Sequence, residues 1–251
     1  MARAAVLGRL TWQLGTVADL VKETPRVSSL VLNVPGWTGH RAGQHLDVRL
    51  TAEDGYRAQR SYSIASAPES GLVTMTVERI EDGEVSPYLV GEVVVGDRLE
   101  IRGPIGGYFV WEAGLTSQPL LLIGAGSGVV PLMAMVRHRQ SSNSRVPTRL
   151  LYSSRSFEDV IFREELDRLA DAGDGLDVRH TLTRVQPPAW TGFARRVDRT
   201  MVSEVAWPVG EDPVAYVCGP TSFVEAVAGF LVEFGYSPQA IRTERFGPTG
   251  S

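Results

Sequence analysis

The chain of 251 residues is long enough for two domains of ordinary size, and its hydrophobic content of 43% and charged content of 22% are typical of a globular protein. A formal net charge of −4 gives no support for nucleic-acid binding, and no apolar run approaches the ~20 residues that a membrane span needs. Arg3 and Arg9 leave no room for the apolar core of a signal peptide, so we expect a cytoplasmic protein.

Residues that bind metals or form covalent intermediates are few. Cys218 is the only cysteine, which excludes an intramolecular disulfide and a four-cysteine iron–sulfur cluster within this chain. Lys22 is the only lysine among 25 basic residues, which speaks against Schiff-base chemistry and a Walker-type phosphate loop. The four histidines are His40, His45, His138 and His180. They show no metal-ligand spacing, so we expect them at the surface or in core packing and expect no metal site.

The first half, from Thr11 to about Val110, has the pattern of short β-strands. The expected strands cover residues 28–34, 44–50, 60–66, 72–79 and 97–103. They contain β-branched residues with rough two-residue alternation and are separated by Gly, Pro and Asp turns. Strands at this spacing favour an antiparallel barrel or sandwich.

The second half changes to alternating strands and helices after residues 116–119. Extended segments are expected at 120–126, 148–154, 176–183 and 212–219, and helices from the end of the first of these to His138, at 162–171 and at 221–235. The continuous apolar run at 120–126 suits a strand that is covered on both faces. This alternation predicts a parallel sheet with covering helices, in a second domain that begins near Leu115.

A glycine-rich turn, "GAGSGVVP", connects the first of these strands to its helix. Gly124, Gly126 and Gly128 would let the backbone turn tightly and approach a ligand, and the helix that follows would offer free N–H groups to an anion. Pro131 fits the first turn of that helix. Because Val129 replaces the third glycine of the usual dinucleotide-binding pattern, a simple tight connection remains an alternative.

The end of the next strand indicates which nucleotide would bind. In a dinucleotide fold an acid at this position bonds a ribose 2′-hydroxyl, whereas a cation accommodates a 2′-phosphate. Here Ser154 and Arg155 follow the strand, and no acid occurs before Glu158. The sequence therefore favours NADP over NAD, with an ordinary surface arginine as the alternative.

Two motifs in the first half could together form a ligand site, although each also has a simpler structural explanation. Residues 60–63, "RSYS", would place Arg60 and Tyr62 on one face of a strand and Ser61 and Ser63 on the other. In "GEVSPYLV" at 83–90, Ser86 is a suitable helix N-cap and a proline follows it. Such a helix start could hold a pyrophosphate together with Arg60. A half-buried strand and a capped helix are the alternatives.

Taken together, these motifs resemble the ferredoxin–NADP reductase family, in the same order and over residues 11–246. Members are flavoproteins with an antiparallel FAD-binding barrel followed by an NADP-binding α/β domain. The resemblance therefore implies FAD and NADPH as cofactors, a barrel domain at 1–115, and a nucleotide domain at 116–251 that ends in a flavin-facing segment. In the R-x-Y-S pattern, Arg60 would hold the FAD pyrophosphate, Tyr62 would pack on the isoalloxazine, and Ser63 would lie near flavin N5.

Other segments extend the resemblance. "VER" at 77–79 resembles the strand beside the ribityl chain, "GEVS" at 83–86 resembles a second pyrophosphate segment, and "GPIGGYF" at 103–109 resembles the loop that ends the barrel. "CGP" at 218–220 would end a strand beside the nicotinamide. "TERF" at 243–246 would supply an acid and an aromatic ring over the flavin face opposite Tyr62. The cofactor-binding residues implied are Arg60, Ser61, Tyr62, Ser63, Val77, Arg79, Gly83, Val85, Ser86, Gly124, Gly126, Ser127, Gly128, Ser154, Arg155, Arg163, Cys218, Gly219, Pro220 and Phe246.

By resemblance, the catalytic residues are Ser63, Cys218 and Glu244. Cys218 would set the nicotinamide against the flavin rather than act as a nucleophile; an inert buried thiol is the alternative. The chain departs from plant-type members because "GPTGS" follows Phe246, which leaves the role of that ring and of the tail open.

The implied reaction passes electrons from NADPH through FAD to a separate ferredoxin or other iron–sulfur protein, as in a multicomponent oxygenase, because no iron–sulfur domain is fused here. No membrane or nucleic-acid partner is expected. An NAD(P)H:flavin reductase that releases reduced flavin, or a non-catalytic flavin-binding subunit, remains an alternative.

Overall fold

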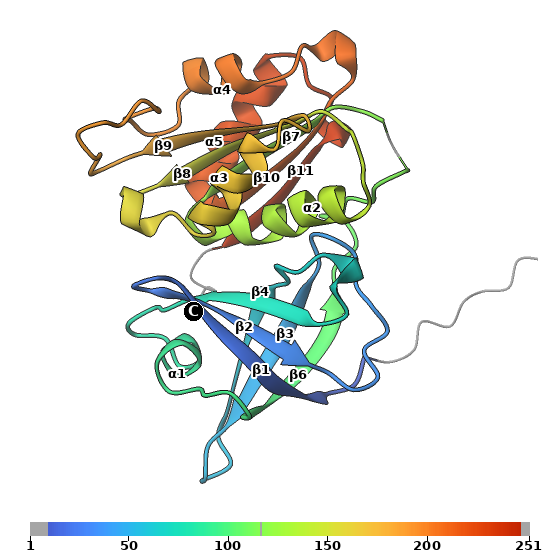
Figure 1. Ribbon diagram of the computed structural model, residues 1–251, viewed down its shortest axis with the longest axis vertical. Coiled ribbons are helices and arrows are strands. Elements are labelled where there is room, and N and C mark those ends of the chain that lie inside the picture. The colour runs from blue at the N-terminus through green and yellow to red at the C-terminus, as the bar shows by residue number, and fades with distance from the viewer. Residues whose placement is uncertain (1–9, 116, 247–251) are drawn as a thin grey trace, which may run out of the picture.

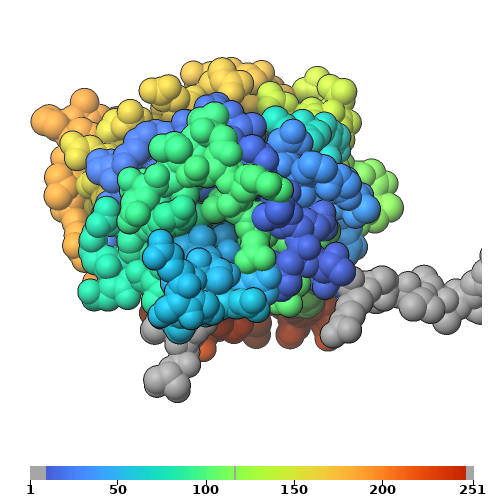
Figure 2. Space-filling view, turned by 90° about the horizontal axis from the view of Figure 1, so that it is seen from below, coloured from blue at the N-terminus to red at the C-terminus, as the bar shows by residue number. Residues whose placement is uncertain are grey.

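The computed structural model describes residues 10–115 and 117–246, which form two units, each built on one sheet. The two units are stacked one above the other, with helix α2 between the upper sheet and the lower one (Figure 1). Seen from below, the lower unit fills most of the visible face and parts of the upper unit appear around its rim (Figure 2). The segment 247–251, whose role the sequence leaves open, lies outside the described residues.

The first unit is an antiparallel barrel. Its strands are β1 (Gln13–Thr24), β2 (Val27–Asn33), β3 (His45–Thr51), β4 (Arg57–Ser63), β5 (Val73–Glu78) and β6 (Arg98–Ile105), in the order β4-β3-β6-β1-β2-β5. The two edge strands meet because Ile64 bridges Met75 and the Ala65 N–H donates to the Thr74 carbonyl at 2.7 Å. Side chains such as Leu30, Leu46 and Ile101 fill the barrel core. The short helices η1 (Pro68–Ser70) and α1 (Ser86–Gly91) lie in its connections.

The second unit is a five-stranded parallel sheet with helices on both faces. Its strands are β7 (Leu120–Ala125), β8 (Thr148–Ser154), β9 (Leu176–Leu182), β10 (Val214–Pro220) and β11 (Ile241–Phe246), in the order β11-β10-β7-β8-β9. Its helices are α2 (Val129–Ser141), α3 (Arg163–Asp171), α4 (Arg199–Val205) and α5 (Thr221–Glu233), with short 3-10 turns η2 (Gly126–Gly128), η3 (Phe157–Asp159), η4 (Val209–Glu211) and η5 (Pro238–Ala240). The predicted fold class, a barrel followed by an α/β domain, is confirmed.

Helix α2 joins the two units through apolar packing. Nine of its residues are buried, and seven of them share one core cluster with Ala42, Ala65 and Trp111 of the first unit. Helices α4 and α5 pack in a different cluster on the other face of the sheet. The division at residue 115 remains a prediction. No helix among the described residues is both long and apolar enough to cross a membrane.

Two strands and one α-helix were not predicted. Strand β1 mixes polar and apolar residues and contains register shifts, which blur its two-residue alternation. Strand β11 has the sequence "IRTERF", with three charged residues, and lies at the sheet edge where such residues remain partly solvated. Helix α4 has only seven residues, too few to show a clear helical period.

Candidate functional site

The glycine loop after β7 contacts the neighbouring strand. Gly126 has φ of +55°, which favours glycine, and a Cβ built there would meet no atom within 4 Å, so this part of the loop faces open space. By contrast, a Cβ at Gly128 would lie 2.2 Å from the Cys218 carbonyl oxygen. This glycine therefore allows β10 to approach the loop, and its expected contact with a ligand remains a prediction.

The three predicted catalytic residues converge where the two units meet. Antiparallel pairing places Ser63 of β4 directly opposite His45 of β3. Parallel pairing places Cys218 of β10 beside Glu244 of β11. Between the units, His45 Nδ1 lies 3.9 Å from Glu244 Oε1. We call Ser63, His45, Glu244 and Cys218 the interface cluster.

Sequence reasoning missed His45, which it assigned to the surface or to core packing. The residue follows Gln44 in a strand that forms a hairpin with the "RSYS" strand. That hairpin was the available signal, because cross-strand neighbours of a functional residue share its face of the sheet.

Burial favours the neutral forms of Glu244, Cys218 and His45 in the interface cluster. It raises the pKa of Glu244 from 4.5 to about 7. It also raises the pKa of the fully buried Cys218 thiol well above its ordinary value, with the Glu244 charge adding to the effect. Burial lowers the pKa of His45, partly opposed by the negative charge of Asp47. A protonated thiol is a poor nucleophile, so Cys218 is not set up for covalent catalysis.

Two atoms of the cluster lack partners that buried polar atoms normally have. Ser63 Oγ and Glu244 Oε2 are buried and make no hydrogen bond to any described residue. Such orphaned groups fit a ligand that carries both hydrogen-bond donors and acceptors, as an isoalloxazine ring or a nicotinamide amide does. The residues present therefore suit a flavin and a nicotinamide at this contact.

The structure brings Arg60 to the "GEVS" segment, as a shared pyrophosphate site requires. Arg60 Nη2 donates to Glu84 Oε2 at 2.6 Å, and the Tyr56 hydroxyl donates to Glu84 Oε1. Both Arg60 and Glu84 side chains are more than 40% exposed. The carboxylate of Glu84 thus occupies the donor face of Arg60 that would bind a phosphate.

The predicted N-cap role of Ser86 is wrong. Helix α1 begins at Ser86 itself, its N-cap is Val85, and no side chain caps it. The Ser86 hydroxyl instead accepts a hydrogen bond from the Ile80 N–H at 3.0 Å, which fixes the preceding turn. Gly83 belongs to the same turn, since its N–H donates to the Ile80 carbonyl.

The other residues assigned to flavin binding differ in exposure. Val77 and Val85 lie in the barrel core, so they would reach a ligand only through their backbone. The Ser61 hydroxyl donates to Asp47 at 2.6 Å. Tyr62 is half-buried against the barrel core, and burial raises its pKa. Arg79 Nε lies 3.3 Å from Glu81 Oε2 at the surface.

Arginines gather at the carboxyl end of β8. Ser154 is buried, whereas Arg155 is exposed and its side chain makes no hydrogen bond or ion pair with the described residues. The Arg163 guanidinium lies 4.6 Å over the Phe157 ring. Arg184, which sequence reasoning did not single out, donates its backbone N–H to the Arg155 carbonyl. These groups leave a positive, solvent-accessible surface beside Ser154.

The ends of β10 and β11 complete the region. Gly219 is buried and Pro220 is exposed, directly before helix α5. Phe246 pairs with Pro220 in the parallel register and packs, partly buried, against the core below the sheet. Ser127 is half-buried in the glycine loop.

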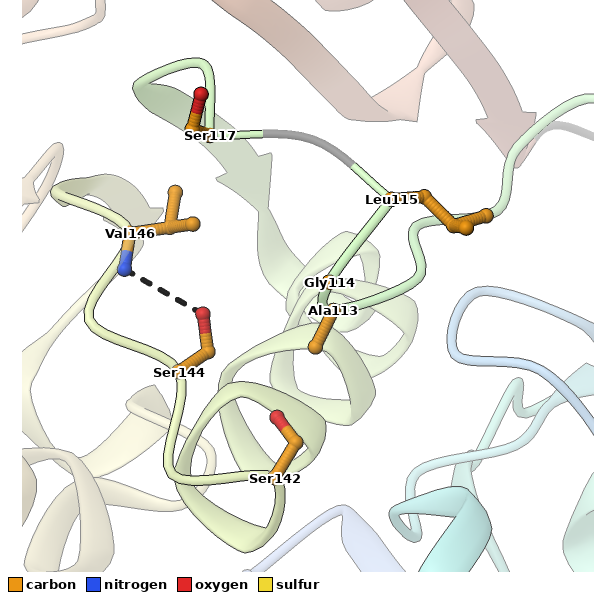
Figure 3. Close-up of a pocket in the computed structure, with 7 residues that line it drawn as sticks. All are labelled: Ala113, Gly114, Leu115, Ser117, Ser142, Ser144 and Val146. Carbon is orange, nitrogen blue, oxygen red and sulfur yellow. Dashed lines mark hydrogen bonds between the residues drawn. The ribbon is translucent and has the colours of Figure 1, made fainter.

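Two cavities lie away from the interface cluster. An open groove of about 900 Å³ runs between the barrel and helices α2 and α3, and Arg163 is the predicted site residue on its wall. A second cavity of about 550 Å³ lies where the chain passes from barrel to sheet, between Ala113–Leu115 and Ser142–Val146 (Figure 3). None of the predicted site residues lines the second cavity.

A barrel, a glycine loop on a parallel sheet and a polar cluster at their contact define a flavin- and nicotinamide-nucleotide-dependent oxidoreductase. Comparison with protein families agrees: residues 17–110 match the oxidoreductase FAD-binding domain, and residues 122–229 match the oxidoreductase NAD-binding domain. The chain belongs to the ferredoxin–NADP reductase-like family of FAD-dependent oxidoreductases.

Similar proteins include several reductase subunits. The glycine betaine monooxygenase reductase subunit of Pseudomonas aeruginosa (strain UCBPP-PA14) is 29% identical over 215 residues, which cover 83% of this chain and 57% of that protein. The ferredoxin–NAD(P)(+) reductase component of the naphthalene 1,2-dioxygenase/salicylate 5-hydroxylase systems of a Ralstonia species is 26% identical over 239 residues, or 94% of this chain and 69% of that protein.

A solved structure is also similar. The FAD/NAD-binding domain of nitric oxide dioxygenase from Vibrio cholerae O1 biovar El Tor superposes with a TM-score of 0.81 and 27% identity, over 94% of this chain and 99% of that one. The chain thus spans nearly all of this two-domain unit. It spans only 57% of the Pseudomonas protein.

Proposed function

We propose that the protein is an NADPH-dependent FAD reductase that passes single electrons to a separate iron–sulfur protein such as a ferredoxin. The observation that carries the proposal is the convergence of Ser63, Cys218 and Glu244 at the contact of the two units, with two buried polar atoms left unpartnered. When bound, FAD supplies the chemistry: it accepts a hydride, and on reoxidation it releases electrons one at a time together with a proton.

The residues of the chain have distinct tasks in this reaction. Arg60 binds the pyrophosphate after exchanging its Glu84 carboxylate for phosphate oxygens. The Ser63 hydroxyl donates a hydrogen bond to the flavin edge. Glu244 holds a proton near neutral pH. Buried Cys218 and the Gly128 contact fix the end of β10, against which the nicotinamide packs.

The preference for NADPH rests on the arginines at the end of β8. Arg155 is free to bind a 2′-phosphate, and Arg163 and Arg184 increase the positive potential nearby. No acid lies between Ser154 and Glu158 to bond a ribose hydroxyl.

The names of similar proteins support the proposed class of electron acceptor. Their names describe reductase components of monooxygenase and dioxygenase systems, which supports an iron–sulfur protein or oxygenase as the partner. The segment 195–199 contains three arginines that could face an acidic partner, but two of them are already in ion pairs. Arg195 pairs with Asp198, and Arg199 pairs with Glu233.

A three-step experiment tests the proposal. The purified protein should contain one noncovalent FAD, anaerobic NADPH should bleach it, and the reduced protein should then reduce an added ferredoxin. A colourless protein that cannot be reconstituted with FAD contradicts the whole proposal. A flavin that stays oxidised with NADPH indicates a non-catalytic subunit, and reduced FAD that leaves the protein on gel filtration indicates a flavin reductase.

A further inference from the structure

Arg60, the residue assigned to the FAD pyrophosphate, is already bonded through both of its terminal nitrogens. Its Nη1 donates to the Gln59 carbonyl at 2.7 Å, and its Nη2 donates to Glu84 Oε2 at 2.6 Å. A bidentate phosphate contact uses two neighbouring N–H groups of one guanidinium, so it needs at least one terminal nitrogen. A diphosphate that binds Arg60 therefore meets the Glu84 carboxylate at the same donors.

Glu84 reaches Arg60 from a turn whose backbone is fixed by its own hydrogen bonds. The Gly83 N–H donates to the Ile80 carbonyl, and the Ser86 hydroxyl accepts from the Ile80 N–H at 3.0 Å. Because these bonds hold residues 80–86 in place before α1, the contact between Glu84 and Arg60 orders only the two side chains that make it. The same contact can open without any movement of the backbone.

The Tyr56 hydroxyl holds the second oxygen of the same carboxylate. It donates to Glu84 Oε1, while Arg60 is bonded to Oε2. Tyr56 ends the turn 52–56 before β4, where its carbonyl accepts from the Ala52 N–H at 2.9 Å. The hydrogen bonds from Tyr56 and Arg60 lower the pKa of Glu84 below 4.5, so the carboxylate is charged at neutral pH. Protonation therefore does not free Arg60 under these conditions.

The ion pair is open to solvent and hence to a ligand. The side chains of Arg60 and Glu84 are 41% and 45% exposed. The neighbouring acid Glu81 lies 3.3 Å from Arg79 and 3.8 Å from Arg26, so it has cationic partners of its own. Within the described part of the chain, Glu84 forms its ion pair with Arg60 alone.

We propose, on the basis of the FAD site in the function proposed above, that Glu84 is an internal competitor of the FAD diphosphate for Arg60. The carboxylate occupies a donor that the diphosphate needs, and once displaced its negative charge still repels the phosphates. Both effects weaken binding, so Glu84 sets how tightly the protein holds FAD. The opposite role, in which Glu84 orients Arg60 for a phosphate, would strengthen binding.

The expected size of the effect follows from the behaviour of exposed ion pairs. Such a pair is closed about 1.5 to 5 times as often as it is open, which leaves Arg60 free in roughly 0.2–0.4 of the molecules. The apparent dissociation constant rises by the reciprocal of that fraction, about 2.5- to 6-fold. Repulsion between the carboxylate and the diphosphate adds a further factor of a few at low salt. Removing the charge of Glu84 should therefore tighten FAD binding roughly 3- to 30-fold.

Dilution of the FAD-loaded protein, followed by the fluorescence of released flavin, measures this effect. Glu84→Gln should lower the FAD dissociation constant roughly 3- to 30-fold at low salt and by less at high salt, because salt screens the charges. Tyr56→Phe keeps the ring but releases Glu84 Oε1, and it should lower the constant by a smaller factor. Glu53→Gln is the matched control, since Glu53 is exposed in the turn 52–56 and makes no ion pair with the described residues. It should leave the constant within about twofold. An unchanged or higher constant in Glu84→Gln overturns the proposal.

A second pair of variants separates competition from the effect of charge alone. In an Arg60→Ala background, Glu84→Gln should improve FAD binding much less than it does in the wild-type background, because the contested donor is gone. An equal improvement in both backgrounds overturns the proposed competition. The assay uses oxidised FAD and requires neither NADPH nor an acceptor. If binding changes as expected but NADPH does not reduce the flavin, the proposed reductase function fails and the role of Glu84 stands.

Discussion

Replacing Glu244 by glutamine should stabilise the flavin-free protein at neutral and alkaline pH. Burial raises the pKa of this carboxyl from 4.5 to about 7, so the unfolded chain ionises before the folded one does. The associated stability is present below pH 4.5 and is lost as the pH rises through 7. A shift of roughly 2.5 units at about 1.4 kcal/mol each corresponds to about 3 kcal/mol. Glutamine keeps the shape and cannot ionise, so it should avoid that loss.

Urea unfolding of both proteins between pH 4.5 and 8 measures this difference. The variant minus wild-type free energy should be near zero at the acid end, increase through the interval, and level off at about 3 kcal/mol above pH 7. Other buried groups such as His40 and His180, whose pKa values burial lowers, contribute equally to both proteins and cancel. Glu92→Gln, at an exposed position after α1, is the matched control and should show no such rise. A Glu244→Gln difference that does not change with pH would refute the reasoning.

Three further substitutions test the proposed roles. Arg60→Ala removes a charge-assisted bond worth about 1.5–3 kcal/mol, so the FAD dissociation constant measured by fluorescence should rise roughly 10- to 150-fold; unchanged retention would remove Arg60 from the site. Arg155→Ala should raise KM for NADPH by a similar factor and leave NADH nearly unaffected, whereas an equal effect on both would show that it does not read the 2′-phosphate. Cys218→Ala should slow stopped-flow flavin reduction by up to ~100-fold at saturating NADPH, and Cys218→Ser by less; a lowered melting temperature with an intact rate would indicate a structural cysteine.

The order of most strands and helices could be predicted from the sequence because local patterns and long-range packing agree. The apolar run at 120–126 and the glycine turn after it predicted β7 and its loop, and the amphipathic segment 221–235 predicted α5. Strand β11 could not be predicted in this way. Its three charged residues are tolerated because only β10 pairs with it, and that edge position is a property of the whole sheet.

The motifs located individual side chains better than they located their partners. "RSYS" identified Arg60, but its contact with Glu84 depends on a turn 24 residues away. Ser86 had the residue type and the following proline of an N-cap, yet its hydroxyl bonds to Ile80 because the turn before α1 folds back on itself. Local preference predicts what a side chain can do, and the tertiary fold selects among those options.

The contacts within the interface cluster also could not be predicted from local sequence patterns. His45 and Glu244 are separated by most of the chain, and neither has a sequence neighbour that would identify its partner. Their meeting depends on α2, which holds the barrel against the sheet, and on Gly128, which lets β10 lie close under the loop and so places β11 beside it. The raised pKa of Glu244 follows from that burial rather than from any nearby charge. The acid–base properties of this site are therefore produced by the packing of the two units.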